Sequence, residues 1–179
     1  MRDPNRLTAD EFFGWQALVD GRYELIDGHI TPHPDYVTPL GFAAPDNDHA
    51  AVCATLIGML QMQLRAPCRV YVGAGTIVDR VNANVPDIAV SCSESDRAEK
   101  ALAGPRLILE VSSTKTARID TGRKVDDYLA IATVESYVVV DRSRRAITVY
   151  APDRGPQTYT AGVIDIARAI ALDVEAIFA

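Results

Sequence analysis

The sequence has few of the residues from which disulfide frameworks and zinc sites are built. It contains 3 cysteines and 3 histidines among 179 residues, and Cys53, Cys68 and Cys92 show no C-x-x-C spacing. An odd number of cysteines at such spacings is typical neither of a disulfide scaffold nor of a zinc knuckle. We therefore expect reduced, chemically inert cysteines in or near the core.

Long hydrophobic runs are also missing. No apolar stretch of this sequence reaches the roughly 18 residues that a membrane-spanning helix needs. Residues 1–10 are polar and lack the apolar core of a signal peptide. The sequence thus predicts a cytoplasmic protein in aqueous solution, without a membrane partner.

An excess of positive charge is absent, since the formal net charge is -6. Proteins that bind nucleic acid over a broad surface usually carry basic stripes, so this balance argues weakly against such a surface. Residues 115–145 differ from the rest, with seven basic residues against five acidic ones. A site for a polyanion is therefore expected in this segment.

Phosphate-binding and nucleophile motifs are not found either. The two glycines of Gly73-Ala74-Gly75 follow a predicted strand, but no helix opens after them, so they indicate a turn and not a dinucleotide site. The chain contains no P-loop and no G-x-S-x-G elbow. These absences exclude the common nucleotide-binding and serine-hydrolase classes.

Hydrophobic residues make up 48% of the chain and are spread along its length, which is typical of a globular protein. The length suits one sizeable core, so we expect one domain over residues 1–179. Hydrophobic periodicity predicts an α/β fold, a mixed β-sheet flanked by helices. The expected helices are residues 9–19, 48–65 and 120–132, with a last helical turn at 174–178. The expected strands are 69–72, 76–78, 85–90, 107–111, 136–141 and 146–150, with one further strand in the tail before the last turn.

Local signals support the first elements. Thr8 and Glu11 form a capping box at the start of the first helix. Asp27-Gly28 lies between two short strand-like runs, which predicts a hairpin at a sheet edge. Residues 31–48 contain four prolines and are expected to form a long loop.

Two carboxylates interrupt apolar strands. Glu110 lies near the end of an otherwise apolar run, and Asp87 follows Pro86 within another. A buried unpaired carboxylate costs several kcal/mol, so each needs a proton, a cation or a metal. Because the two runs are expected to be neighbouring strands, the carboxylates face each other, and a divalent cation relieves their repulsion.

Oxygen ligands of this kind select Mg²⁺ or Mn²⁺ over zinc, since no cysteine or histidine is expected beside Asp87 and Glu110. Such a metal polarises a phosphoryl oxygen and lowers the pKa of a bound water. Lys124 lies one turn into the next predicted helix, with Tyr128 four residues later. Its ammonium is placed to orient the attacking water or to offset charge on the phosphate.

This set of residues resembles the Uma-two family of restriction endonuclease-like proteins, within the PD-(D/E)-x-K nuclease superfamily. The resemblance rests on Pro86-Asp87, Glu110 to Ser113, and Gly122 to Lys124 with Tyr128. It extends over nearly the whole chain, from Tyr23-Glu24-Leu25-Ile26-Asp27-Gly28 and His49 to residues 136–141 and Ala176-Ile177-Phe178. It implies a restriction endonuclease-like core and Mg²⁺-dependent hydrolysis of phosphodiester bonds, with Asp87 and Glu110 as metal ligands.

The sequence departs from the superfamily pattern at one position. The lysine expected two residues after the glutamate is replaced by Ser112, so the resemblance moves its role to Lys124. Lys115, in a stretch that reads differently from the relatives, is a rival for that role. Glu24 resembles an acid that such nucleases bring near the metal. The resemblance therefore implies that Glu24 is a further metal ligand or a water-positioning residue.

Plainer interpretations compete with these roles. Asp87 and Glu110 are equally compatible with ion pairs to Lys124, Arg123 or Arg106. The histidines are expected at the surface or in loops (His29, His33) or at the start of a helix (His49). The turn containing Arg142, Arg144 and Arg145 either contacts phosphates or is a solvated hairpin tip, and we favour the tip.

The sequence therefore predicts a Mg²⁺- or Mn²⁺-dependent endonuclease acting on DNA, with Asp87, Glu110, Lys124 and Glu24 in its catalytic site. A homodimer is expected because such nucleases cut two strands. The alternative is a catalytically silent nuclease fold that serves as a binding or regulatory module.

Overall fold

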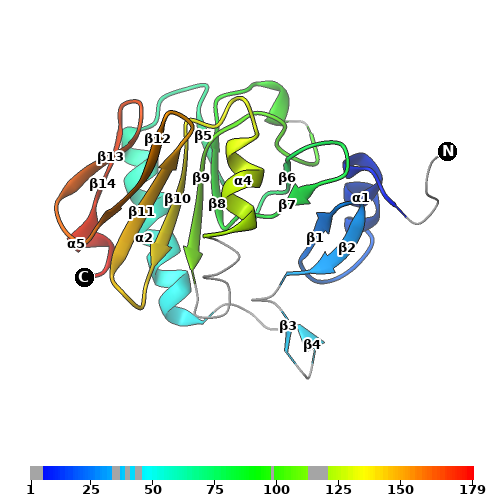
Figure 1. The fold of residues 1–179 in the computed structure, drawn as a ribbon, viewed down its shortest axis with the longest axis horizontal. Helices are drawn as coiled ribbons and strands as arrows, with labels where there is room; N and C mark the ends of the chain where they lie inside the picture. The colour runs from blue at the N-terminus through cyan, green and yellow to red at the C-terminus, as the bar shows by residue number, and fades with distance from the viewer. Residues whose placement is uncertain (1–5, 34–36, 39–40, 43–45, 98, 113–120) are drawn as a thin grey trace.

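The computed structural model describes residues 6–33, 37–38, 41–42, 46–97, 99–112 and 121–179. Figure 1 shows a main β-sheet with helices on both of its faces and a smaller sheet beside one end of it. Within the described residues, no helix is both long and apolar enough to cross a membrane. The predicted α/β architecture with a mixed sheet flanked by helices is confirmed.

The main sheet has six strands in the order β12-β11-β10-β9-β8-β5. β9 and β10 are parallel, and every other neighbouring pair in this sheet is antiparallel. The sheet is therefore mixed, and its two central strands carry long apolar runs that are buried on both faces. Its strands are β5 (Arg69–Val72), β8 (Ile88–Ser91), β9 (Pro105–Ser112), β10 (Ser136–Asp141), β11 (Ala146–Ala151) and β12 (Arg154–Tyr159).

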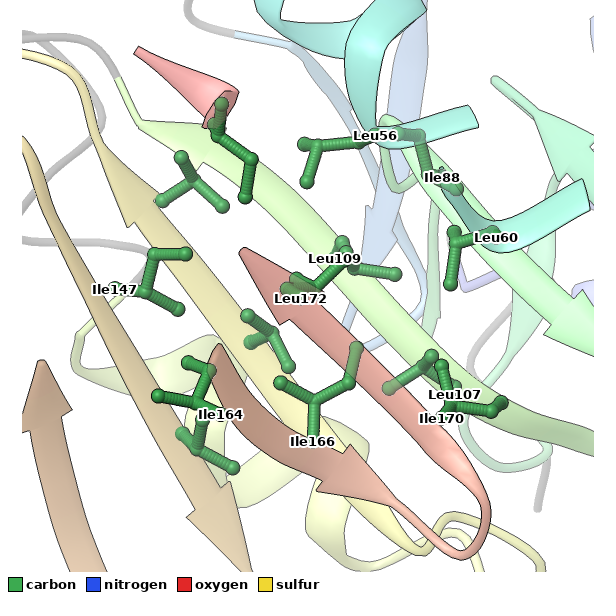
Figure 2. Packing of buried hydrophobic residues seen from close by; sticks show 14 of the residues in the cluster. Leu56, Leu60, Ile88, Leu107, Leu109, Ile147, Ile164, Ile166, Ile170 and Leu172 are labelled. Atoms are coloured by element: carbon green, nitrogen blue, oxygen red, sulfur yellow. The ribbon is translucent and has the colours of Figure 1, made fainter. Parts of the chain in front are cut away.

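Helices cover both faces of this sheet. On the first face, α2 (Asn47–Gln63) buries Leu56 and Leu60 against Leu107 and Leu109 of β9, as Figure 2 shows. The hairpin of β13 (Val163–Ala167) and β14 (Ile170–Asp173), followed by α5 (Val174–Ile177), completes that core. On the second face, α4 (Arg123–Leu129) packs Tyr128 into a separate cluster.

Alternation along β9 decides which side chains reach which helix. Leu107 and Leu109 belong to the α2 cluster, whereas Ile108 belongs to the α4 cluster. Successive side chains of a strand point to opposite faces, so Glu110 shares the α4 face with Ile108. The carboxylate is thereby directed at the helix that carries Lys124.

The smaller sheet has the order β2-β1-β7-β6 and is covered by α1 (Ala9–Gln16). The predicted capping box of Thr8 and Glu11 is present at the start of α1. Asp27 and Gly28 both have positive φ, 50° and 81°, as a two-residue hairpin turn requires. The remaining strands are β1 (Tyr23–Ile26), β2 (His29–Pro32), β6 (Thr76–Ile77), β7 (Ala83–Asn84) and the separate hairpin β3 (Val37–Thr38) and β4 (Gly41–Phe42).

The expectation of one continuous strand at 85–90, within one sheet, is wrong. The chain forms β7 in the smaller sheet, leaves strand geometry at Val85–Asp87, and enters the main sheet as β8. Pro86 has no N–H to donate to a ladder, which favours a break at this point. Asp87 consequently lies at the junction of the two sheets.

Other boundaries also differ from the predictions. The first, second and α4 helices are shorter than expected, and the four-proline segment contains the short β3–β4 hairpin. β5, β10 and β11 lie where the sequence places them, to within one residue. The C-terminal region holds more strand than expected, because β12, β13 and β14 precede the predicted last turn, α5.

The cysteine prediction is wrong for two of the three residues. Cys68 and Cys92 form a disulfide that links the chain just before β5 to the chain just after β8. The odd total concealed this pair, since the spacing along the chain says nothing about a cross-strand neighbour. Cys53 is a free, half-buried thiol.

Candidate metal-dependent active site

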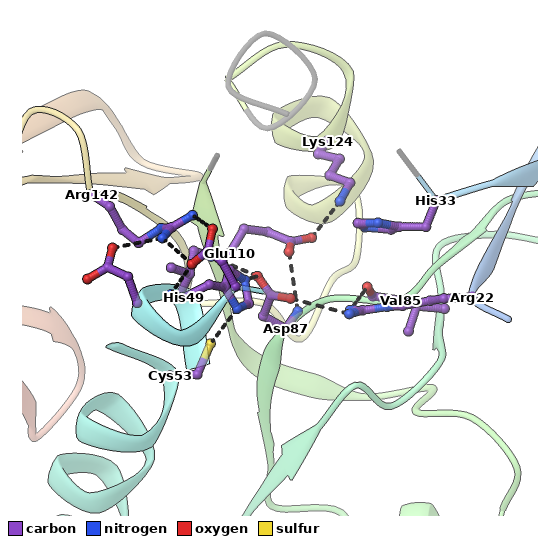
Figure 3. Close-up of polar contacts among 12 residues, drawn as sticks. Arg22, His33, His49, Cys53, Val85, Asp87, Glu110, Lys124 and Arg142 are labelled. Carbon is purple, nitrogen blue, oxygen red and sulfur yellow. Dashed lines mark hydrogen bonds and ion pairs between the residues drawn. The ribbon is translucent and has the colours of Figure 1, made fainter. Parts of the chain in front are cut away.

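Asp87 is held from two sides at the sheet junction, as Figure 3 shows. Its Oδ2 accepts a hydrogen bond of 2.9 Å from the backbone N–H of Val111. Its Oδ1 forms an ion pair of 3.3 Å with Arg22, which also donates to the carbonyl of Val85. The side chain is buried, so its position is set by these partners and not by solvent.

Glu110 receives its partners from α4. The Nζ of Lys124 lies 2.7 Å from Oε1, and the hydroxyl of Tyr128 donates to the same oxygen at 3.1 Å. Lys124 is 1% exposed and Glu110 is 2% exposed. Residues 124 and 128 are one helical turn apart and therefore share the helix face that meets β9.

The two carboxylates are coupled through the backbone. The Asp87 N–H donates to Oε2 of Glu110 at 3.2 Å, while the residue after Glu110 donates to Asp87. Glu110 lies on β9 as expected, whereas Asp87 lies just before its neighbour β8, whose first residue Ile88 is opposite Leu109. Both acids therefore lie at one end of this antiparallel pair.

Glu24 joins the same group from β1. Its Oε1 lies 3.3 Å from the Nζ of Lys124, and its Oε2 lies 3.3 Å from Arg123. Arg123 also pairs with Asp127 at 2.6 Å. Lys124 is thus shared between Glu24 and Glu110, and the structure brings all four sequence-predicted residues together.

His49 approaches Asp87 from the first turn of α2. Its Nε2 lies 3.2 Å from Oδ2 of Asp87, and its Nδ1 lies 3.7 Å from the Sγ of Cys53. These three side chains offer donor atoms that all lie within 4.8 Å of one another. The expectation that no histidine or cysteine accompanies the acids is therefore wrong.

The charges around Asp87 determine its protonation. Burial raises the pKa of its carboxyl, but the hydrogen bond with His49 and the charge of Arg22 outweigh burial and hold the pKa well below its usual value. Burial likewise lowers the pKa of His49, and the hydrogen bonds with Asp87 and Cys53 raise it to about 10. These two shifts favour a carboxylate beside an imidazolium at neutral pH.

The pKa values of His33 and Tyr128 are also shifted by burial and by the charges of the site. Burial, followed by the charges of Lys124 and Arg22, lowers the pKa of His33 to about 2, so this ring is neutral. Burial and the charge of Glu110 raise the pKa of Tyr128 well above 10.0, so the phenol keeps its proton as a donor. His33 lies just after β2, outside any helix or strand as expected, but it is 2% exposed and therefore not at the surface.

Several partners of the site were missed from the sequence. The plain alternative named Lys124, Arg123 and Arg106 as partners of the two acids; Lys124 does pair with Glu110, but Arg123 binds Glu24 and Arg106 binds Glu135. Arg22 and His49 instead contact Asp87 from 65 and 38 residues away along the chain. Only the position of His49 at the start of a predicted helix gave any signal. Lys115 lies outside the described residues.

Two arginines of the β10–β11 turn differ in their exposure to solvent. Arg144 is 83% exposed, as a solvated tip requires, but the Arg142 side chain is only 15% exposed. Arg142 bonds to Asp46 and Asp48 at 2.7 Å each, and Asp46 is the N-cap of α2. It therefore ties the β10–β11 turn to the start of the helix that carries His49.

The residues present fit a divalent cation. Asp87 and Glu110 supply carboxylate oxygens whose positions are fixed by backbone N–H groups, and His49 supplies an imidazole nitrogen beside them. Carboxylate oxygens suit Mg²⁺ and Mn²⁺, and imidazole is also a common metal ligand. The acids at this end of β8 and β9 would hold the ion.

Comparison with known proteins agrees with this architecture. Residues 9–171 match the model of the Uma2 family, described as "Putative restriction endonuclease". Among solved structures, a "putative nuclease belonging to DUF820" from Anabaena variabilis is similar with a TM-score of 0.74 and 16% sequence identity, covering 96% of this chain and 97% of the other. None of the curated proteins matches. At that identity the structural likeness shows the fold.

Proposed function

The chain belongs to the Uma2 family of restriction endonuclease-like proteins, and we propose that it hydrolyses phosphodiester bonds of DNA with the aid of Mg²⁺ or Mn²⁺. The observation that carries the proposal is the buried contact between Lys124 and Glu110, next to the backbone-linked pair of Glu110 and Asp87. A buried ammonium beside two fixed carboxylates provides a metal site and a cation for the reacting phosphate in one place.

Asp87 and Glu110 would hold the ion, whose chemistry is to polarise the phosphoryl oxygen and to acidify a bound water. Hydrolysis then adds a hydroxyl to phosphorus and releases one ester oxygen as an alcohol. Lys124 stabilises negative charge that develops on the phosphate oxygens, and it orients the water. Glu24 contacts the same Lys124 ammonium that Glu110 contacts, at 3.3 Å, and helps to position it.

Position in the fold supports Lys124 for this role. The Nζ of Lys124 is fixed by two buried carboxylates, one on each sheet, and only 1% of the residue is exposed. An ordinary surface lysine keeps its ammonium in water and buries only its stem. Burial of the Lys124 ammonium between Glu24 and Glu110 therefore supports a role in the reaction.

Basic side chains near the site suit a polyanionic substrate. Arg123 is partly exposed at the start of α4, and Arg144 projects from the β10–β11 turn. Both belong to the basic segment of the sequence, and contacts from such residues to phosphates position DNA without reading its bases. A homodimer would present two such sites to the two strands.

A silent nuclease fold is the second candidate, and one observation favours it. Each acid of the site already has a cationic partner: Arg22 and His49 for Asp87, Lys124 for Glu110, and Lys124 with Arg123 for Glu24. A closed network of ion pairs can stabilise a fold without any ion. DNA binding that persists in EDTA without cleavage would support this candidate.

Titration calorimetry with Mn²⁺ tests the proposal. Wild-type protein is expected to bind the ion, and Asp87→Ala and Glu110→Ala are each expected to abolish measurable binding. Asp153→Ala is the matched control, because Asp153 is an exposed acid in the turn between β11 and β12, and its removal is expected to leave binding unchanged. Absence of Mn²⁺ binding by the wild type, with a short DNA duplex present, would favour the silent network.

A further inference from the structure

His49 occupies a position that ion pairing alone does not explain. Its ring lies between α2 and the sheet junction, with Asp87 on one edge and Cys53 on the other. The residue is 8% exposed, and its backbone N–H donates to the N-cap Asp46 at 2.7 Å. Asp46 is in turn fixed by Arg142, so the first turn of α2 is anchored before the ring reaches Asp87.

Asp87 has two other partners besides this histidine. Arg22 already supplies a permanent positive charge at 3.3 Å, and the Val111 N–H satisfies Oδ2. A histidine differs from another arginine in one respect that matters here, because its ring nitrogen can donate a lone pair to a metal. Nε2 is the nitrogen that faces the carboxylate.

The distances suit two ligands of one ion. Nε2 of His49 and Oδ2 of Asp87 are 3.2 Å apart. Neighbouring ligands around an ion at about 2.1 Å are separated by about 3 Å in octahedral geometry. No movement of the backbone is needed to place both atoms on the same cation.

The other ring nitrogen is oriented as metal-bound histidines usually are. Such a histidine commonly uses its second nitrogen for an outer contact, which fixes the tautomer and the ring orientation. Here Nδ1 faces the Sγ of Cys53 at 3.7 Å, and the two residues are four apart on α2. Cys53 is a half-buried free thiol that no other part of the proposed chemistry uses.

We propose that His49 Nε2 is a direct ligand of the ion held by Asp87, so that the site combines an imidazole nitrogen with carboxylate oxygens. This inference rests on the proposed metal-dependent function and specifies its ligand set. A bound cation would lie between Nε2 and Oδ2 of Asp87, which contact each other directly in this structure. Cys53 acts as a positioning residue for the ring.

The ligand set has a consequence for metal preference. Mg²⁺ favours oxygen ligands and retains its waters, whereas imidazole suits later divalent metals. Affinity for N and O donors also rises from Mn²⁺ to Co²⁺. The site therefore prefers Mn²⁺ and Co²⁺ over Mg²⁺, and His49→Gln is expected to reduce Mn²⁺ affinity by at least about tenfold while changing Mg²⁺ affinity less.

Pulsed electron paramagnetic resonance of the Mn²⁺-loaded full chain tests the nitrogen ligand directly. Wild-type protein is expected to show hyperfine coupling from a directly bound ¹⁴N, and [¹⁵N]histidine labelling is expected to convert it into ¹⁵N coupling. His49→Gln removes the coupling. His29→Gln, which changes an exposed histidine, retains it. The labelled wild type gives an answer even if a variant folds poorly.

The outcomes separate this inference from the proposed function. Mn²⁺ binding that depends on Asp87 but shows no nitrogen coupling would overturn the role of His49 and leave the metal site intact. Coupling that persists in His49→Gln would assign the nitrogen elsewhere and overturn the inference as well. Absence of any Mn²⁺ binding would overturn both. Loss of the coupling in His49→Gln alone supports the ligand.

Discussion

Asp87 and Glu110 are each held by the backbone next to the other: the Asp87 N–H donates to Glu110 at 3.2 Å, and the Val111 N–H donates to Asp87 at 2.9 Å. Backbone donors cannot rotate away as side chains do, so the two carboxylates keep their mutual placement as long as β8 and β9 stay paired. The placement of the two acids thus depends on the register of β8 and β9, next to the junction segment that holds Asp87.

Lys124 is expected to be coupled to Glu110 in stability. Lys124→Met leaves Glu110 without its cation and Glu24 with Arg123 alone, and it is expected to lower the free energy of unfolding by about 3–5 kcal/mol. Glu110→Gln in the Lys124→Met background removes one of those acids, so the loss in the double variant is smaller than the sum of the single losses by about 0.5–3 kcal/mol. Urea unfolding of the four proteins measures this coupling.

The control for this cycle is Lys100→Met, which alters an exposed lysine and is expected to change stability by less than about 0.5 kcal/mol. Additive losses for Lys124→Met and Glu110→Gln would mean that the two side chains do not share a buried ion pair. Such a result would remove the main support for Lys124 as part of the site.

The Asp87–His49 pair makes stability depend on pH in metal-free protein. The pKa of His49 is raised from 6.5 to about 10 in the folded state, so its contribution is fully present below pH 6.5 and is lost as the pH rises through 10. The difference in unfolding free energy between wild type and His49→Gln is therefore expected to shrink over this range. Urea unfolding in EDTA across the range measures it.

Low pH is expected to weaken the same Asp87–His49 pair by protonating Asp87. The pKa of Asp87 is lowered from 3.8, so its contribution is present above that value and is lost as the pH falls further. A difference between wild type and His49→Gln that stays constant from pH 6.5 to 10 would contradict the assigned ion pair.

The Cys68–Cys92 disulfide is expected to stabilise the end of the sheet remote from Asp87. It closes a loop with a sequence separation of 24, for which chain entropy predicts a stabilisation of about 3 kcal/mol. Thermal unfolding with and without a reductant measures this, and Cys68→Ser provides the control that no longer responds to reductant. Equal unfolding temperatures for reduced and oxidised wild type would contradict the prediction.

Much of the fold could be predicted because its signals are local. The capping box at Thr8, the Asp27-Gly28 turn and the apolar runs of β9 and β10 each depend on neighbours in the sequence. The break at Pro86 was visible as a proline, but its consequence was not. Whether a strand ends or changes sheet there depends on packing against β1 and β9, which lie far away along the chain.

The residues of the site also fall into a group that the sequence predicts and a group that it does not. Asp87 and Glu110 were indicated by charge within apolar strands, and Lys124 by its place in an ordered motif. Arg22, His33 and His49 reach the acids from segments whose placement depends on tertiary packing. His33, which the sequence places in a loop, is buried in the structure. Such partners cannot be predicted from the sequence, because they are distant along the chain and residue type alone does not specify where a side chain points.

Cleavage of supercoiled plasmid DNA tests the central claim most directly. Wild-type protein with Mn²⁺ or Mg²⁺ is expected to nick or linearise the plasmid, EDTA is expected to stop the reaction, and Asp87→Ala and Glu110→Ala are each expected to lower the rate at least about 100-fold. Asp153→Ala is expected to cut like the wild type. Cleavage that continues in EDTA, or that survives in both site variants, would contradict a metal-dependent centre at Asp87 and Glu110.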